Sequence, residues 1–77
     1  MFGQVLRNAR ENAGLTQEKL SFEAGLDRRY ISHLENDYKS PTLTVLFRLC
    51  EALNVAPSSL IRLVEESEGF RNKNVKK

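Results

Sequence analysis

The sequence has a single cysteine and no long apolar run. With only Cys50 available, no disulfide can form within the chain, and such cysteine usage is typical of a reducing compartment. No stretch approaches the roughly 18 consecutive apolar residues of a membrane-spanning helix. The start of the chain also lacks the basic segment and apolar run of a signal peptide. We therefore expect a soluble, cytoplasmic protein.

The residue patterns of catalysis and of metal binding are also missing. No nucleophile–base pair, paired carboxylates or phosphate-cradling loop is visible, so we expect no enzyme activity. Cys50 and His33 have no partner at a metal-ligand spacing, so we expect no metal and no cofactor. Cys50 is more simply a small core residue. Nothing in the sequence indicates a small-molecule ligand.

Net charge does not by itself indicate a nucleic-acid partner. The chain carries +2, but residues 1–70 hold eight basic and ten acidic groups, because four basic residues lie near the end: Arg71, Lys73, Lys76 and Lys77. A DNA-binding role therefore needs positive charges gathered on one face. We predict a domain at 1–66 and a basic, disordered tail at 67–77. The alternative role for this tail is to add salt-sensitive affinity for DNA.

Turn signals divide the chain into five short segments, most with the apolar spacing of helices. The expected helices cover about 2–13, 17–24, 28–35, 43–53 and 57–64, and the acidic run at 65–68 is expected to be the solvated end of the last helix. Low aromatic content, 8%, within a hydrophobic fraction of 40% indicates one modest, leucine-rich core. No segment alternates as a strand does, and no Asn-Gly or Asp-Gly hairpin turn occurs. The predicted fold class is all-α.

Local signals mark where these helices begin and end. Thr16, Asp27 and Thr42 are predicted N-caps, and Gly14 and Gly25 follow the ends of the first two helices. The apolar spacing of the fourth helix predicts a core-facing stripe made of Leu43, Leu46, Leu49, Cys50 and Leu53.

The most informative stretch is 17–36, two helices of about eight residues that meet at a glycine turn. Apolar residues on the inner side of both helices leave one outward face on the second helix. That face carries hydrogen-bond donors and no acid, with Tyr30 at its edge: Arg28, Arg29, Ser32 and His33. A helix that lies in the major groove of DNA needs such a surface.

In these residues the sequence resembles the Cro/Xre-type helix-turn-helix repressors of phages and bacteria. The resemblance covers about residues 2–64. Its motifs are Gly14-Leu15-Thr16-Gln17, Leu20, Ala24-Gly25-Leu26, Tyr30-Ile31-Ser32, Leu34-Glu35, Pro41-Thr42-Leu43 and Leu49-Cys50-Glu51-Ala52-Leu53-Asn54-Val55. The short length and the Arg-Tyr-Ile-Ser run at 29–32 also resemble restriction-modification controller proteins.

The resemblance implies a five-helix, lambda-repressor-like domain. It also implies a transcriptional regulator that binds double-stranded DNA sequence-specifically. Such a regulator binds as a homodimer at a pseudo-palindromic operator, with a recognition helix at about 28–35 in the major groove. An alternative is an antitoxin-like protein-interaction module that also binds DNA. Whether such a regulator represses or activates depends on where its operator lies.

The resemblance also implies roles for single positions. Base contacts fall to Arg28, Arg29, Ser32 and His33, and phosphate contacts fall to Gln17, Tyr30, Asn36, Lys39 and Ser40. Arg10 and Glu35 match a partly buried ion pair between the first and third helices. Alternatives stay open for these residues. The two arginines form an ordinary solvated first turn, or one of them holds phosphate only; His33 is a surface residue and Gln17 is uninvolved. The Tyr30 ring packs on the turn, and the ion pair is a loose surface contact. Asp37 lies near the expected phosphate path and puts the loop contacts in doubt.

A dimer interface is predicted from an apolar excess on the last two helices. The fifth helix carries more apolar residues than one core-facing stripe needs, and Phe47 lies on the opposite side of the fourth helix from its stripe. The predicted interface residues are Phe47, Leu60, Ile61 and Val64. The alternative is a monomer whose extra apolar residues seal its own core.

Overall fold

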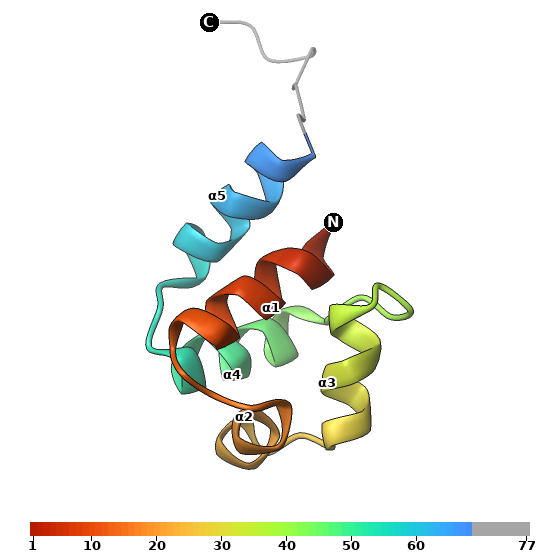
Figure 1. Cartoon of the computed structure of the whole chain (residues 1–77). Coiled ribbons are helices and arrows are strands. Elements are labelled where there is room, and N and C mark those ends of the chain that lie inside the picture. The colour runs from red at the N-terminus through yellow and green to blue at the C-terminus, as the bar shows by residue number, and fades with distance from the viewer. Residues whose placement is uncertain (69–77) are drawn as a thin grey trace, which may run out of the picture.

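The computed structural model describes residues 1–68, which form five α-helices and no strand (Figure 1). The helices are α1 (Phe2–Asn12), α2 (Gln17–Ala24), α3 (Arg28–Glu35), α4 (Leu43–Leu53) and α5 (Pro57–Ser67). The all-α prediction is confirmed.

Side-chain caps start the three middle helices where the sequence predicts them. Each cap accepts a hydrogen bond from a backbone N–H two or three residues later: Thr16 from Lys19 at 3.0 Å, Asp27 from Arg29 at 2.7 Å and Thr42 from Val45 at 3.1 Å. Gly14 and Gly25 follow α1 and α2 with φ of 73° and 69°, the left-handed conformation that glycine adopts without steric cost. The local signals therefore place the helix boundaries.

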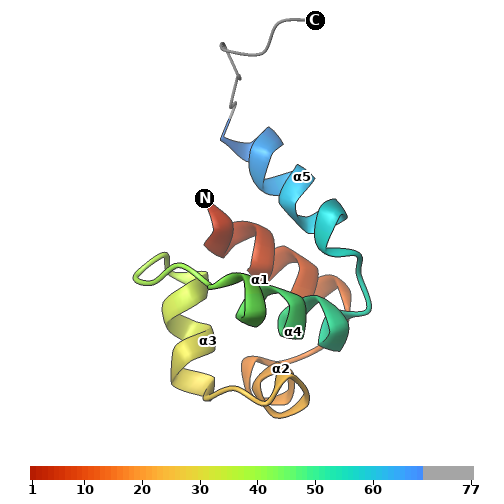
Figure 2. The same ribbon diagram turned by 180° about the vertical axis from the view of Figure 1, so that it is seen from behind.

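The five helices pack around one core, with α1 and α4 between the α2–α3 pair and α5 (Figures 1 and 2). Helix α1 contacts α3 and α5, and α4 contacts α2 and α5. Most of the core is aliphatic: Phe2, Val5, Leu6, Leu20, Ala24, Ile31, Leu34, Leu46, Leu49, Cys50, Leu53 and Leu60. The α2–α3 pair and α5 thus lie at opposite ends of the molecule.

Three expectations from the sequence need correction. Leu43 is not a core residue: it is the first residue of α4 and is 71% exposed. Ala13 follows α1 as its C-cap instead of ending the helix. Helix α5 continues through Ser67, so the predicted boundary at 66 falls inside a helix. Of the predicted tail at 67–77, only the first two residues belong to the described part of the chain.

No single helix within residues 1–68 is long and apolar enough to span a membrane. Helices α4 and α5 reach that length and composition only as a pair, and the pair is bent by 108° at its break.

Candidate DNA interface

The position of α3 is set by its inner face and by its junction with α2. Ile31 and Leu34 are fully buried, and the small Ser21 lets the two helices approach closely because its side chain is buried without filling much volume. At the turn, the Leu26 N–H donates to the Ser21 carbonyl at 2.8 Å. Helix α3 is therefore held with one side in the core and the other side outward.

The outward side of α3 is polar and carries the predicted base-reading residues. Arg28 and Arg29 are exposed, and within residues 1–68 neither guanidinium makes a hydrogen bond or an ion pair. Ser32 and His33 lie half-buried further along the helix. Tyr30 is half-buried and packs against the core. Two arginines at a helix N-terminus, where cations are disfavoured, thus point their donors to solvent.

The loop after α3 continues this surface. Lys39 and Ser40 are exposed, and Asn36 donates from its side chain to the Ser32 carbonyl at 2.9 Å. Tyr38, a residue that the sequence did not single out, is 76% exposed. Its ring meets His33 edge-on, with centroids 5.8 Å apart and planes at 63°. Sequence spacing gave no signal for this pair, because the loop conformation creates it.

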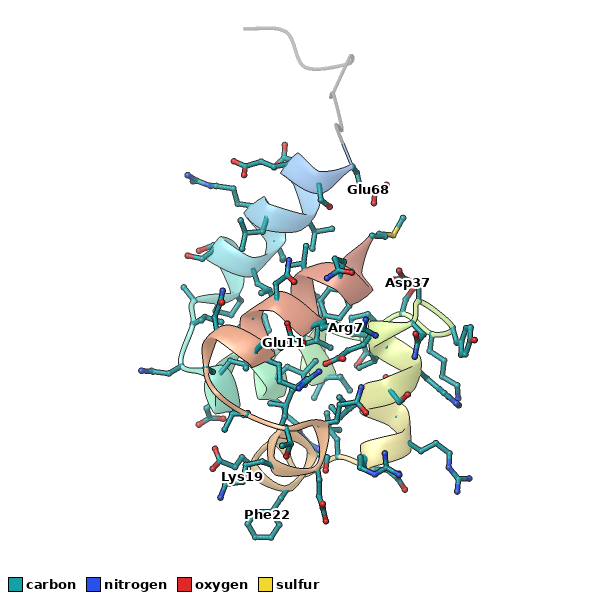
Figure 3. All side chains as sticks on the ribbon, in the orientation of Figure 1. Arg7, Glu11, Lys19, Phe22, Asp37 and Glu68 are labelled. Carbon is teal, nitrogen blue, oxygen red and sulfur yellow. The ribbon has the colours of Figure 1, made fainter. Side chains whose placement is uncertain are left out.

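A buried cluster around Glu35 anchors the other end of α3. The Glu35 side chain is fully buried and accepts four hydrogen bonds from three side chains. Arg10 donates from Nε to Oε2 at 2.6 Å and from a terminal nitrogen to Oε1 at 3.1 Å. Gln17 donates to Oε1 at 3.0 Å and Arg7 to Oε1 at 3.3 Å. The cluster therefore joins α1, α2 and α3, and Figure 3 shows Arg7 reaching from α1 toward α3.

This cluster exceeds the pair that the sequence predicted. Glu35 is fully rather than partly buried, and Arg7 was not foreseen as a partner. The structure places the Gln17 amide on Glu35, and one N–H of that amide is left for another acceptor. Arg10 also donates to the Leu15 carbonyl at 2.8 Å, which fixes the segment that enters α2.

Glu35 is ionised at neutral pH. Burial by itself raises the pKa of the Glu35 carboxyl, but hydrogen bonds from Arg10, Gln17 and Arg7, together with the charge of Arg10, outweigh it. The pKa therefore lies below the usual 4.5. The hydrogen bond to Glu35 in turn raises the pKa of Arg10.

Comparison with known proteins agrees with this geometry. A helix-turn-helix family model matches residues 6–60, more than half of the chain. The chain belongs to the Cro/Xre-type helix-turn-helix family. The predicted resemblance to this family and its lambda-repressor-like fold are confirmed.

Restriction-modification controllers are among the similar proteins. The control protein C.BamHI of Bacillus amyloliquefaciens is 37% identical over 62 residues, 79% of this chain and 76% of that protein. The solved controller C.AhdI from Aeromonas hydrophila is 41% identical with a TM-score of 0.75, over 77% of this chain and 89% of that one. The biofilm regulator SinR, solved in complex with DNA, is 26% identical with a TM-score of 0.75, over 79% of this chain and 98% of that one.

Three of the four predicted interface residues expose apolar side-chain surface on α4 and α5. Phe47 is 57% exposed, Ile61 is 47% exposed and Val64 is half-buried. Leu60 is a correction: it is 2% exposed, because α5 turns this residue into the core, so it adds nothing to the surface. Leu63, which is not among the predicted interface residues, is also 50% exposed.

Within residues 1–68 of this helix-turn-helix protein, no group of three potential metal-ligating side chains comes together. Cys50, on α4, is buried in the hydrophobic core, and burial raises the pKa of its thiol. A buried, protonated thiol is unreactive, as expected of a core residue.

Proposed function

We propose that this helix-turn-helix protein is a sequence-specific transcriptional regulator of the cytoplasm that binds double-stranded DNA, and that it is not an enzyme. The observation that carries the proposal is the pair of exposed arginines at the start of α3, which make no ion pair within residues 1–68, on a helix whose other end is anchored through Glu35. Rigid presentation of free donors is what base readout requires. The DNA complex of the similar regulator SinR supports this reading.

In the proposed complex, α3 lies in the major groove. Arg28 and Arg29 donate to guanine O6 and N7, and Ser32 and His33 contact bases one turn further along. Phosphate contacts come from residues around this helix: Gln17, Tyr30, Asn36, Lys39 and Ser40. The second N–H of the Gln17 amide serves this contact while the first stays on Glu35.

We further propose that the protein binds as a homodimer through α4 and α5. Phe47 on α4 and Ile61 and Val64 on α5 leave apolar side-chain surface open to solvent, which a two-fold interface would cover. One recognition helix reads few base pairs, whereas two helices related by symmetry read half-sites about 34–36 Å apart. The operator is then pseudo-palindromic.

Selection from randomised duplexes at fixed salt tests the DNA proposal. We expect enrichment of one pseudo-palindrome whose half-sites are centred one helical turn apart. A footprint on the enriched duplex should cover both half-sites. Failure to enrich any sequence at micromolar protein would contradict the proposal and favour the antitoxin-like alternative.

Analytical ultracentrifugation tests the dimer. Phe47→Glu and Ile61→Glu should each shift the protein toward monomer, because a charge cannot be buried unpaired at an apolar interface. Phe22→Glu is the matched control, since Phe22 is 83% exposed on α2, far from α5 (Figure 3). A wild-type protein that stays monomeric at tens of micromolar and footprints one half-site would rule out the dimer.

A further inference from the structure

The loop between α3 and α4 turns sharply at Asp37. This residue has φ of 61°, and the only other non-glycine residue with positive φ within residues 1–68 is Asn54. Most side chains disfavour the left-handed region, although Asp and Asn tolerate it better than others. A compensating interaction is therefore expected at Asp37.

The Asp37 carboxylate provides that interaction by capping α1. Its Oδ1 accepts a hydrogen bond from the Gly3 N–H at 2.9 Å, and its Oδ2 lies 3.5 Å from the Met1 amine. Met1, the residue at the N-cap position of α1, makes no side-chain cap of its own. A residue 34 positions away in the sequence thus satisfies the first turn of α1, where a negative charge is favourable. Figure 3 shows Asp37 in the loop beside the start of α1.

Gly3 brings the two segments close enough for this bond. A Cβ atom at Gly3 would lie 2.2 Å from the Glu35 carbonyl oxygen and 2.8 Å from the Leu34 carbonyl oxygen. The start of α1 therefore packs directly on the backbone of the last turn of α3. Because backbone packs on backbone here, the start of α1 has a fixed position relative to α3. A loop that Asp37 ties to α1 is therefore fixed relative to α3 as well.

The same turn places Tyr38 on the opposite side of the loop. While Asp37 faces α1, the Tyr38 backbone N–H donates to the His33 carbonyl at 2.9 Å and its ring meets the His33 ring edge-on. Lys39, the next residue, is exposed. One residue therefore ties the loop to α1 while its neighbour contacts the end of the recognition helix.

We propose that Asp37 is a positioning residue for DNA binding: by capping α1 it holds Tyr38 against His33 and aims Lys39 at the DNA backbone. The DNA part of this inference rests on the proposed function. The Asp37 side chain is 43% exposed, but both of its oxygens face the start of α1, at the Gly3 N–H and the Met1 amine, so its proposed role is to hold the loop rather than to contact phosphate. The Tyr38 ring becomes part of the DNA-facing surface.

The free protein allows a direct test, because His33 is its only histidine. The Cε1 proton of His33 should give one resolved NMR signal, whose chemical shift depends on the neighbouring Tyr38 ring. Tyr38→Ala shows the position of that signal without the ring. Tyr38→Phe keeps an aromatic ring and should leave the signal near its wild-type position. Asp37→Gly permits the left-handed turn but removes the cap, so it should move the signal toward its Tyr38→Ala position. Asp37→Asn keeps an acceptor and tolerates the turn, so it should move the signal less. Glu23→Ala, an exposed acid on α2, should leave it unchanged.

Binding to the selected duplex completes the test. Asp37→Gly should weaken binding by up to about tenfold, the equivalent of a lost helix cap. Combined with Lys39→Ala, it should weaken binding by less than the product of the two single effects, because both act through one contact. Circular dichroism below the melting temperature checks that each variant is folded, and Asp37→Asn serves if Asp37→Gly does not fold.

Two results would overturn the inference. One is a folded Asp37→Gly protein whose His33 signal stays at the wild-type position. The other is binding that is unchanged or tighter in the Asp37 variants while Arg28→Ala binds weakly, because that pattern indicates either no role or simple repulsion. If the Arg28→Ala and Arg29→Ala variants also bind as the wild type does, the proposed function fails, and the His33 signal still decides the role of Asp37.

Discussion

The two ends of α3 differ in almost every physical respect. At the start, Arg28 and Arg29 are exposed and make no ion pair within residues 1–68. At the end, Glu35 is buried, accepts four hydrogen bonds, and has the backbone of α1 packed against its carbonyl oxygen. An eight-residue helix thus separates two tasks, since the charges proposed to bind DNA are at one end and those that anchor the helix are at the other.

This separation has an energetic consequence. Removing a solvated charge leaves no buried group without a partner, so the free energy of unfolding changes by only about 0.5 kcal/mol or less. Removing one partner of a buried pair leaves an uncompensated charge in the interior. Substitutions at the start of α3 should therefore change DNA affinity, and those at its end should change the free energy of unfolding.

The largest expected effect is at the anchored end. Arg10→Ala should lower the free energy of unfolding by as much as about 3–5 kcal/mol, reduced to the extent that Arg7 and Gln17 still hold Glu35. Urea unfolding measures this change. Arg62→Ala, which removes an exposed arginine of α5, is the matched control and should have little effect. Combining Arg10→Met with Glu35→Leu should restore stability better than either single change, and an unchanged melting temperature for Arg10→Ala would show that the pair contributes nothing.

Low pH should reduce the stabilising contribution of Glu35 at the anchored end of α3. Because the folded-state pKa of Glu35 is lowered, its contribution to stability is present above the usual value of 4.5 and is lost as pH falls through the folded pKa. Melting temperatures of the wild type should therefore fall more steeply below pH 4.5 than those of Glu35→Gln. The two proteins differ only in the group at position 35, so the difference between their curves isolates Glu35. Parallel curves for the two proteins would contradict the assignment.

Substitutions at the exposed start of α3 should change the affinity for DNA and not the free energy of unfolding. Arg28→Ala and Arg29→Ala should each cost about 1–3 kcal/mol on the selected duplex and much less on random DNA, because a bidentate contact to guanine is lost. Fluorescence anisotropy at fixed salt measures both affinities. If one arginine holds only phosphate, its variant should weaken binding to both duplexes alike. Unchanged selectivity in both variants would mean that the recognition surface lies elsewhere.

The smallest expected effect is at Lys39, in the loop beyond the anchored end. Lys39→Ala should weaken binding to selected and random duplexes alike and reduce the salt slope of log K by about one, because one phosphate contact is lost. Titrations at several salt concentrations measure the slope. Lys19→Ala, an exposed lysine on α2 that is not predicted to contact DNA, is the control. A slope equal to that of the wild type would exclude Lys39 from the phosphate contacts.

The sequence by itself determined the helices and the polar face of α3. N-caps such as Thr16 and Asp27, and glycine turns such as Gly25, act within a few residues, so their effect can be predicted without knowing the fold. The outward position of Arg28 and Arg29 follows from helical periodicity once the apolar side of α3 is known. The Arg10–Glu35 pair was suggested only by family resemblance.

Tertiary structure alone decided which distant groups meet and which apolar residues are covered. Arg7 and Gln17 converge with Arg10 on Glu35, and Asp37 caps a helix 34 residues away, although no sequence spacing links these positions. Periodicity marked an apolar stripe on α4 and α5 but could not show that Leu60 is buried while Leu43 is exposed. Burial depends on where the neighbouring helices end, and cross-helix hydrogen bonds depend on a few ångströms of packing, so both are properties of the assembled fold.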